Sequence, residues 1–389
     1  MLSRRYLWLL IAIPIALIAL YFVRYRTPAP ADQTAVPTLN IGPGIIYLSP
    51  ASGPADLYYL NPEDNLPPTR LTVDADARAF DIAPDGSSLV FSAPNTDDSL
   101  DLWRLDLGNG FVNLLHNCQP ANCTAPAFSP DGQWLAYQRI GAVESASQIW
   151  LLNLGSAEAQ RASPDGQSAR DPDWSPDGRL SYYNAVVAAY ETIVPGGATR
   201  TRYPNETGAF LTWAPDGESC VAAESFPASS NIPRGPRGED ELATPDPTNE
   251  APVEVLISAL LRYQGDEQSS LFNYSIELIE DASPAISPDG AYLAFTRKYL
   301  DESRWTPGRQ LWMLDLETRE IGQITNEPNY QVASLAWSSD GSHLAYTRTN
   351  QTDFSTFPEV WMITASGTNA TGANPRLLAL DAYAPQWLS

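Results

Sequence analysis

The stretch Phe128-Ser129-Pro130-Asp131-Gly132-Gln133-Trp134-Leu135-Ala136-Tyr137 decides the fold, because it joins two strand-like runs through one tight turn. Proline presets φ at the second position of such a turn, aspartate tolerates the third, and glycine accepts a positive φ. Six related turns end at Gly86, Gly132, Gly178, Gly217, Gly290 and Gly341. Short strands around a turn that recurs every 40–50 residues or so predict a β-propeller.

A third strand pattern follows the turns, as in Leu102-Trp103-Arg104-Leu105-Asp106-Leu107 and Leu311-Trp312-Met313-Leu314-Asp315-Leu316. Turn and strand together resemble the TolB-like propeller repeat, and the resemblance covers nearly everything after residue 44. Two departures are Ser339, which replaces the turn proline, and the fifth blade, whose turn ends at Gly217 and which has no clear tryptophan in its third strand. The resemblance implies a propeller that binds other macromolecules; it implies no particular activity.

The two ends of the repeat region complement each other. Ile45 to Leu60 supplies a second and a third strand without a first, and Ala384 to Ser389 supplies a first strand and then stops. Pairing these segments closes the ring and removes the exposed sheet edges. We therefore expect an all-β, seven-bladed propeller with six full repeats and one composite closing blade.

The N-terminus carries an apolar run from Tyr6 to Val23 that is long enough to span a bilayer as a helix. A cleaved signal peptide is the alternative, with Ala29-Pro30-Ala31 as the nearest cleavage site. Two arginines flank each side of the run, so the positive-inside rule decides little. We predict an uncleaved transmembrane anchor over 1–26, a Pro/Ala/Thr-rich linker over 27–44 and the propeller over 45–389.

Location and partners follow from the resemblance and the charge. The TolB-like resemblance favours a single-pass protein of the bacterial cytoplasmic membrane with its propeller on the periplasmic side. Acidic residues outnumber basic ones by 46 to 23, and such a surface repels nucleic acid. We expect protein partners in the membrane or cell envelope.

The cysteines indicate structure. Cys118 and Cys123 could chelate a metal or form a small disulfide, but zinc needs a second pair of ligands, so a disulfide is favoured. Cys220 occupies a core position of its repeat, where other repeats have leucine.

Catalysis is not expected from the sequence. It has no Gly-x-Ser-x-Gly elbow, its two histidines His116 and His343 are isolated, and the repeated aspartates serve turn geometry. We expect no catalytic, cofactor or metal residues, and a scaffold for protein–protein interaction. The alternative is a carbohydrate- or peptide-processing lyase or hydrolase that uses the central channel.

A docking surface is predicted where three long loops should cluster, opposite the Asp-Gly turns. One loop lies in an acidic, proline-rich insertion at about 225–249, expected to be disordered, and the other two follow Phe295 and Tyr346. Aromatic and arginine residues are typical anchors of interfaces. The predicted residues are Arg234, Arg237, Arg297, Lys298, Tyr299, Arg304, Trp305, Arg309, Phe354 and Phe357.

Overall fold

A computed structural model describes residues 41–389, apart from 65, 97–98, 142–145, 198–199, 231–252, 275–277 and 366. The predicted anchor, most of the linker, and both Arg234 and Arg237 lie outside the described residues. Within the described part of the chain, no helix has the length and apolar character needed to cross a membrane. One short 3₁₀ helix, η1 (Ala370–Gly372), is present among strands.

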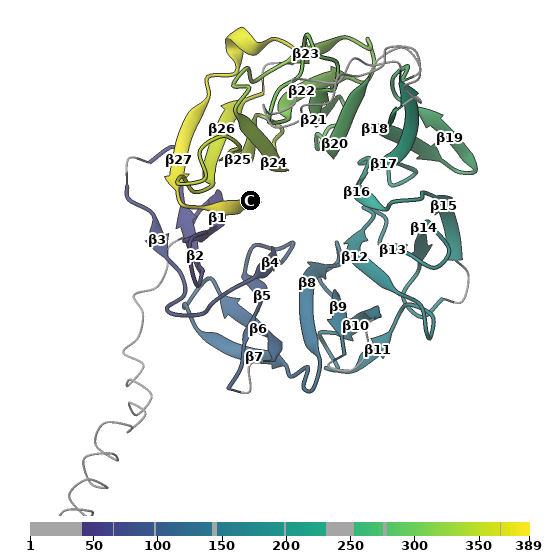
Figure 1. Cartoon of the computed structure of the whole chain (residues 1–389). Helices are drawn as coiled ribbons and strands as arrows, with labels where there is room; N and C mark the ends of the chain where they lie inside the picture. Colours follow the sequence, from purple (N-terminus) through teal and green to yellow (C-terminus); the bar gives the residue numbers. More distant parts are fainter. Residues whose placement is uncertain are drawn as a thin grey trace, which may run out of the picture. The chain divides into compact units, whose positions relative to one another are not determined.

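Five sheets of four strands each are arranged around a common centre (Figure 1). One contains β28 (Tyr383–Leu388), β1 (Gly44–Ser49), β2 (Asp56–Leu60) and β3 (Thr69–Arg70), and the next β4 (Ala79–Ile82), β5 (Ser88–Pro94), β6 (Leu100–Asp106) and β7 (Val112–His116). The third contains β8 (Asn122–Phe128), β9 (Trp134–Ile140), β10 (Ser147–Asn153) and β11 (Ala159–Arg161). The fourth contains β12 (Ala169–Trp174), β13 (Leu180–Asn184), β14 (Ala189–Ile193) and β15 (Arg200–Pro204), and the fifth β24 (Tyr330–Trp337), β25 (His343–Asn350), β26 (Glu359–Thr364) and β27 (Arg376–Leu380).

The sixth sheet has eight strands and departs from the expected pattern. It comprises β16 (Ala209–Trp213), β17 (Ser219–Ser230), β18 (Val253–Gln264), β19 (Glu267–Ser270), β20 (Ile279–Ile286), β21 (Tyr292–Tyr299), β22 (Gln310–Asp315) and β23 (Ile321–Gln323). Ser258 of β18 pairs in parallel with Glu280 of β20, and this contact joins two repeats into one sheet. The predicted count of seven separate blades is therefore not confirmed.

The long arms of β17 and β18 also correct the boundary of the predicted insertion. Residues Ser225–Ser230 continue β17 and pair with β18, from Ser225 opposite Ser258 to Ser230 opposite Val253. They belong to the sheet, because the two strands extend beyond the length used in other repeats. The rest of the predicted insertion, residues 231–249, lies outside the described residues.

Closure of the ring by the two ends of the chain is confirmed. The C-terminal strand β28 pairs antiparallel with β1, with Ile45 opposite Trp387 and Ile46 opposite Gln386. The Gln386 side chain also donates a hydrogen bond to the carbonyl of Phe80 at 2.9 Å. The last strand thus fills the edge of β1 and contacts the neighbouring sheet, as the split repeat predicts.

The first strand of each repeat, here called an inner strand, lies nearest the centre of the ring (Figure 1). These are β4, β8, β12, β16, β20, β24 and β28. Most carry a bulge at a non-glycine residue with positive φ, for example Asp171 at 55° and Phe210 at 55°. A bulge re-aims the side chains of a strand, and non-glycine residues in this region store local strain.

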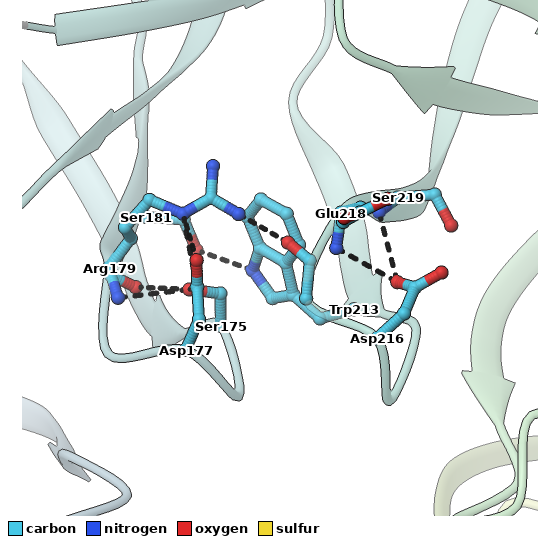
Figure 2. Close-up of polar contacts among 9 residues, drawn as sticks. Ser175, Asp177, Arg179, Ser181, Trp213, Asp216, Glu218 and Ser219 are labelled. Atoms are coloured by element: carbon cyan, nitrogen blue, oxygen red, sulfur yellow. Dashed lines mark hydrogen bonds and ion pairs between the residues drawn. The ribbon is translucent and has the colours of Figure 1, made fainter.

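The turns owe their aspartates to hydrogen bonding (Figure 2). The Asp216 carboxylate accepts bonds from the backbone N–H groups of Glu218 at 2.8 Å and Ser219 at 3.2 Å. Arg179 pairs with Asp177 of its own turn at 2.9 Å, reaches the carbonyl of Gly217 in the next turn, and lies over the Trp213 ring at 5.2 Å. The structural interpretation of the turn aspartates is thus supported, and one arginine ties two turns together.

Candidate functional site

The cysteines have the structural roles that the sequence predicts. Cys118 and Cys123 form a disulfide, and the Cys118 backbone N–H donates to the Asp101 carboxylate at 2.7 Å. Cys220 is a buried free thiol, and burial raises its pKa to about 12. A thiol that stays protonated at neutral pH is a poor nucleophile.

Arg297 does not belong to a docking surface, which corrects one predicted interface residue. Only 6% of it is exposed, and its guanidinium makes two bonds of 2.7 Å to the Asp281 carboxylate. The Phe272 ring lies 4.4 Å from the guanidinium carbon. Asp281 faces Arg297 across β20 and β21, so the positive charge is neutralised inside the sheet.

The loop after β21 brings four of the predicted residues together. Arg304 pairs with Asp301 at 2.7 Å and stacks on Tyr299, with 3.9 Å between the guanidinium carbon and the ring centre. The Lys298 ammonium lies 4.9 Å from the centre of the Trp305 ring, which is 53% exposed. These cation–π contacts fix the loop and leave the Trp305 face at the surface.

The remaining predicted interface residues divide into a paired arginine and two exposed rings. Arg309 pairs with Glu280 at 2.8 Å, and its backbone N–H donates to the Gln331 side chain at 3.0 Å. Phe354 and Phe357, in the loop after β25, are 88% and 50% exposed. Trp305, Phe354 and Phe357 therefore remain candidates for a docking surface.

A second candidate site, which the sequence reading missed, lies on the inner strands. Asp81 of β4 accepts a hydrogen bond from the Phe128 backbone N–H at 2.7 Å. Burial raises the pKa of its carboxyl to about 7, and the negative charge of Asp173 adds to the rise. Asp173 occupies the equivalent position of β12, directly before Trp174, the aromatic residue that precedes the turn. Asp81 and Asp173 are thus equivalent inner-strand carboxyls, and both have raised pKa values.

Asp173 opens into a cavity of about 410 Å³, here called the inner-strand pocket. Asp173 is an exposed residue. The protein around its carboxyl nevertheless removes part of the surrounding water, and this desolvation raises the pKa of Asp173 to about 6. The pocket is lined by Arg170, Asp171, Pro172, Asp173, Tyr190, Gly208, Ala209, Phe210 and Leu211. A carboxyl that titrates near neutral pH inside a pocket is a candidate acid or base.

Two further side chains that line the inner-strand pocket are those of Phe210 and Arg170. Phe210 is 57% exposed, although its phenyl ring is large and apolar. Arg170 forms an ion pair with Asp171, donates to the Thr207 carbonyl at 2.7 Å, and lies over the Tyr183 ring at 4.6 Å. The pocket thus combines an exposed aromatic ring, an arginine whose side chain is fixed by its contacts, and two carboxyl groups.

Comparison of the repeats with one another could have revealed the two aspartates. An aromatic or aliphatic residue precedes each turn. The position directly before that residue is alanine in three repeats, at Ala127, Ala285 and Ala336. Asp81 and Asp173 break that pattern at a position that lies close to the centre of the ring. Their raised pKa values come from burial by the surrounding protein, which no local sequence pattern shows.

Histidines and metal ligands add nothing to this site. His116 contacts the Tyr137 hydroxyl at 3.2 Å, and His343 packs on the Trp387 ring with 6.0 Å between ring centres. Both contacts are those of packing residues, as expected. Across the described residues, no three His, Cys, Asp or Glu side chains are grouped so that they could hold a metal ion.

Two curated proteins are similar to parts of the chain. The uncharacterized peptidase YuxL of Bacillus subtilis is 25% identical over 201 residues, which is 44% of this chain and 29% of that protein. The uncharacterized protein Atu1656 of Agrobacterium fabrum is 23% identical over 191 residues, which is 43% of this chain and 62% of that protein. The matches thus span less than two thirds of either relative's length. No family model matches the chain.

Solved structures share the propeller fold. A prolyl endopeptidase has a TM-score of 0.56 at 13% identity, with 87% of this chain and 50% of that chain covered. An oligogalacturonate lyase in complex with manganese has a TM-score of 0.54 at 15% identity, with 87% and 85% covered. TolB of Acinetobacter baumannii has a TM-score of 0.48 at 14% identity, with 95% and 70% covered. The likeness to the endopeptidase and the lyase confirms the predicted β-propeller fold, and TolB is among the similar structures.

The expectation that the chain is not an enzyme is contradicted. A relative is named as a peptidase, and the propeller fold also occurs in an endopeptidase and a lyase. The sequence reading looked for a nucleophile, a metal site or a separate hydrolase domain. It did not consider Asp81 and Asp173, whose pKa values are raised by burial.

Proposed function

We propose that the propeller binds a carbohydrate chain in the inner-strand pocket and cleaves it by acid–base chemistry. The observation that carries this proposal is the inner-strand pocket, in which Asp173 and Asp171 line one cavity together with the exposed ring of Phe210. The raised pKa of Asp173, about 6, fits the role of an acid. Near pH 6 about half of such carboxyls hold a proton, which suits the donation of that proton to a leaving oxygen. Similarity in fold to a lyase is consistent with it, and carries no more than the fold.

The other lining residues have separate roles in this proposal. Phe210 offers its face to the apolar side of a sugar ring, and Arg170 holds Asp171 in place through their ion pair. Asp171 is the second carboxylate that acid–base cleavage of a glycosidic bond requires. Asp81 carries the equivalent inner-strand carboxyl, and its pKa is raised by burial, with a smaller rise from the charge of Asp173.

The test is cleavage of a panel of neutral and uronate oligosaccharides, followed by release of reducing ends or of unsaturated products. We expect Asp173→Asn to lower the rate by about 10²-fold or more, since general acid–base groups typically contribute 10²–10⁴. Asp165→Asn is the matched control, because Asp165 is a surface residue that pairs with Arg161. An Asp173→Asn variant as active as the parent would contradict the role of Asp173 as the acid. Turnover of peptides but of no oligosaccharide would contradict a carbohydrate substrate.

A second candidate function is a protein-interaction scaffold of the TolB-like kind. The observation that favours it is the exposure of Trp305, Phe354 and Phe357 on loops that follow the second strands of neighbouring repeats. Aromatic residues are enriched among the anchors of protein interfaces. This candidate does not compete with the first, because the two use different residues.

We also propose that residues 1–26 anchor the chain in the bacterial cytoplasmic membrane, with the propeller in the periplasm. The apolar run from Tyr6 to Val23 and the Cys118–Cys123 disulfide support this placement, since disulfides persist in oxidising compartments. From the strand repeats we also propose that the eight-stranded sheet consists of two blades, which brings the number of blades to seven. Protease added to permeabilised cells should digest the propeller, and a mature N-terminus at Asp32 would contradict an uncleaved anchor.

A further inference from the structure

Tryptophans that precede a turn connect neighbouring repeats at three equivalent places, here called junctions. Each indole N–H donates to a backbone carbonyl of the preceding inner strand, at 2.9–3.0 Å. The donors are Trp174, Trp337 and Trp387, and the acceptors are Ala127, Ala285 and Ala336. The repeat thus has a standard place for an indole ring between two sheets.

The floor of these three junctions is always small and apolar. Trp174 packs on Ala136 and Leu151, which face each other across β9 and β10. The same arrangement places Trp337 on Ala294 and Met313, and Trp387 on Ala345 and Met362. Alanine leaves space under the ring, and leucine or methionine fills the side.

Two junctions break this pattern in the same way. Phe128 and Ile286 stand where the other three have tryptophan, and each packs in a cluster with a valine, Val90 and Val221. Arginine replaces the leucine or methionine: Arg104 faces Val90, and Arg262 faces Val221. Both arginines are exposed, and the charge of Arg104 acts on the nearby turn residue Asp85, whose pKa it helps to lower.

Each of these two junctions contains a cavity, and we call them turn pockets. The first measures about 440 Å³ and includes Val90, Arg104 and Phe128 in its lining. The second measures about 410 Å³ and includes Val221, Arg262 and Ile286. Both are also lined by turn aspartates, Asp85 and Asp131 in the first and Asp216 and Asp289 in the second.

We propose that the two turn pockets bind tryptophan side chains of a peptide or protein partner whose flanking residues are neutral or basic. The chain itself fills the equivalent junctions with tryptophan, so a cavity at this place in the repeat suits an indole. Arg104 and Arg262 provide a cation to stack on the ring, as Arg179 does over Trp213 at 5.2 Å (Figure 2). The turn aspartates at the rim repel an acidic flank and attract a basic one.

This site is separate from the inner-strand pocket and does not depend on the proposed enzymatic role. None of the lining residues of the turn pockets lines the inner-strand pocket. The two turn pockets lie in different sheets, and the repeats that form them carry the same substitutions.

The test measures binding of the capped peptide Ac-Lys-Trp-Lys-NH₂ to the full chain by saturation-transfer NMR and calorimetry. We expect two equivalent sites and weaker binding of Ac-Lys-Leu-Lys-NH₂ and Ac-Glu-Trp-Glu-NH₂. The variant F128W/I286W supplies the missing indoles from the chain itself. It should lower the affinity at least about tenfold, the equivalent of 1.4 kcal/mol.

The controls keep the proposal falsifiable. F128L/I286L alters the same positions without filling the pockets and should still bind the tryptophan peptide. If F128W/I286W does not fold, R104M/R262M introduces the methionine found in two other repeats and should weaken binding by itself. No binding to the parent at millimolar peptide, equal binding of the leucine peptide, or unchanged binding by F128W/I286W or by a folded R104M/R262M overturns the proposal.

Discussion

Asp81 and Asp131 belong to the same type of repeat, but their surroundings shift their pKa values in opposite directions. The Ser129 hydroxyl donates to the Asp131 carboxylate at 2.6 Å, and this bond lowers the pKa of Asp131. Asp81 lies farther inside, where burial raises the pKa to about 7. The turn pattern was enough to predict the structural role of Asp131. Asp81 could not be assigned, because the groups that surround it come from other repeats.

The Asp81 shift has a consequence for stability. A carboxyl whose pKa is higher in the folded chain than the ordinary value of about 4 favours folding at low pH. That contribution is complete below about pH 4 and disappears as the pH rises through about 7. Asp81→Asn removes the titration while keeping an oxygen that can accept the Phe128 N–H bond.

We therefore expect the melting temperature of Asp81→Asn, relative to the parent, to rise between pH 4 and pH 8. The corresponding change in the free energy of unfolding should be on the order of 1 kcal/mol, since one pKa unit is worth about 1.4 kcal/mol before solvent screening. Asp131→Asn is the control: its pKa is lowered, so its loss of stability should stay constant from pH 5 to pH 8. A flat difference for Asp81→Asn across that range would contradict the assignment.

At the scale of elements, strand order and pairing were predictable, whereas loop contacts were not. The apolar run after the turn glycine Gly290 predicts β21 (Tyr292–Tyr299), but not that Arg297 of this strand meets Asp281 of β20 and the ring of Phe272. Phe272 comes from a segment outside the repeated pattern, so no comparison of repeats reveals this contact. The Lys298 ammonium lies 4.9 Å from the centre of the Trp305 ring, which stays 53% exposed.

The loops after β21 and β25 give a prediction for the scaffold function. Replacing Trp305 and Phe354 by alanine removes two exposed rings, and neither ring fills the core. We expect the melting temperature to change by less than about 2 °C and capture of a membrane partner to fall at least tenfold or so, as for interface anchors. The measurement is cross-linking in membranes followed by mass spectrometry.

Phe111→Ala provides the matched control for the loop variant. Phe111 is 45% exposed and lies between β6 and β7, away from both loops in sequence and in sheet. Its replacement should leave capture unchanged. Equal capture by the folded Trp305/Phe354 variant and by the parent would show that these rings do not anchor a partner.

At the scale of the whole molecule, the repeats predict a closed ring better than they predict its division into sheets. The split repeat at the two ends correctly indicates that β28 completes the sheet of β1. The single pair between Ser258 and Glu280 merges two repeats, because β18 extends past its usual length toward β20. Such contacts depend on how long a strand continues beyond the pattern, which no turn motif specifies.

Closure by β28 leads to the last prediction, that deletion of Ala384 to Ser389 opens the ring. The deletion removes the Trp387 indole, which donates to the Ala336 carbonyl at 2.9 Å, and the Gln386 bond to the Phe80 carbonyl at 2.9 Å. It also leaves Ile45 and Ile46 on an unpaired strand edge, which favours association with other chains. Loss of a packed tryptophan alone costs about 3–5 kcal/mol, so the melting temperature should fall by roughly 10 °C. Thermal unfolding and size-exclusion chromatography measure both effects, with deletion of Ser389 alone as the control that keeps β28. A truncated protein that melts like this control and remains monomeric would show that the ring holds together without its C-terminal strand.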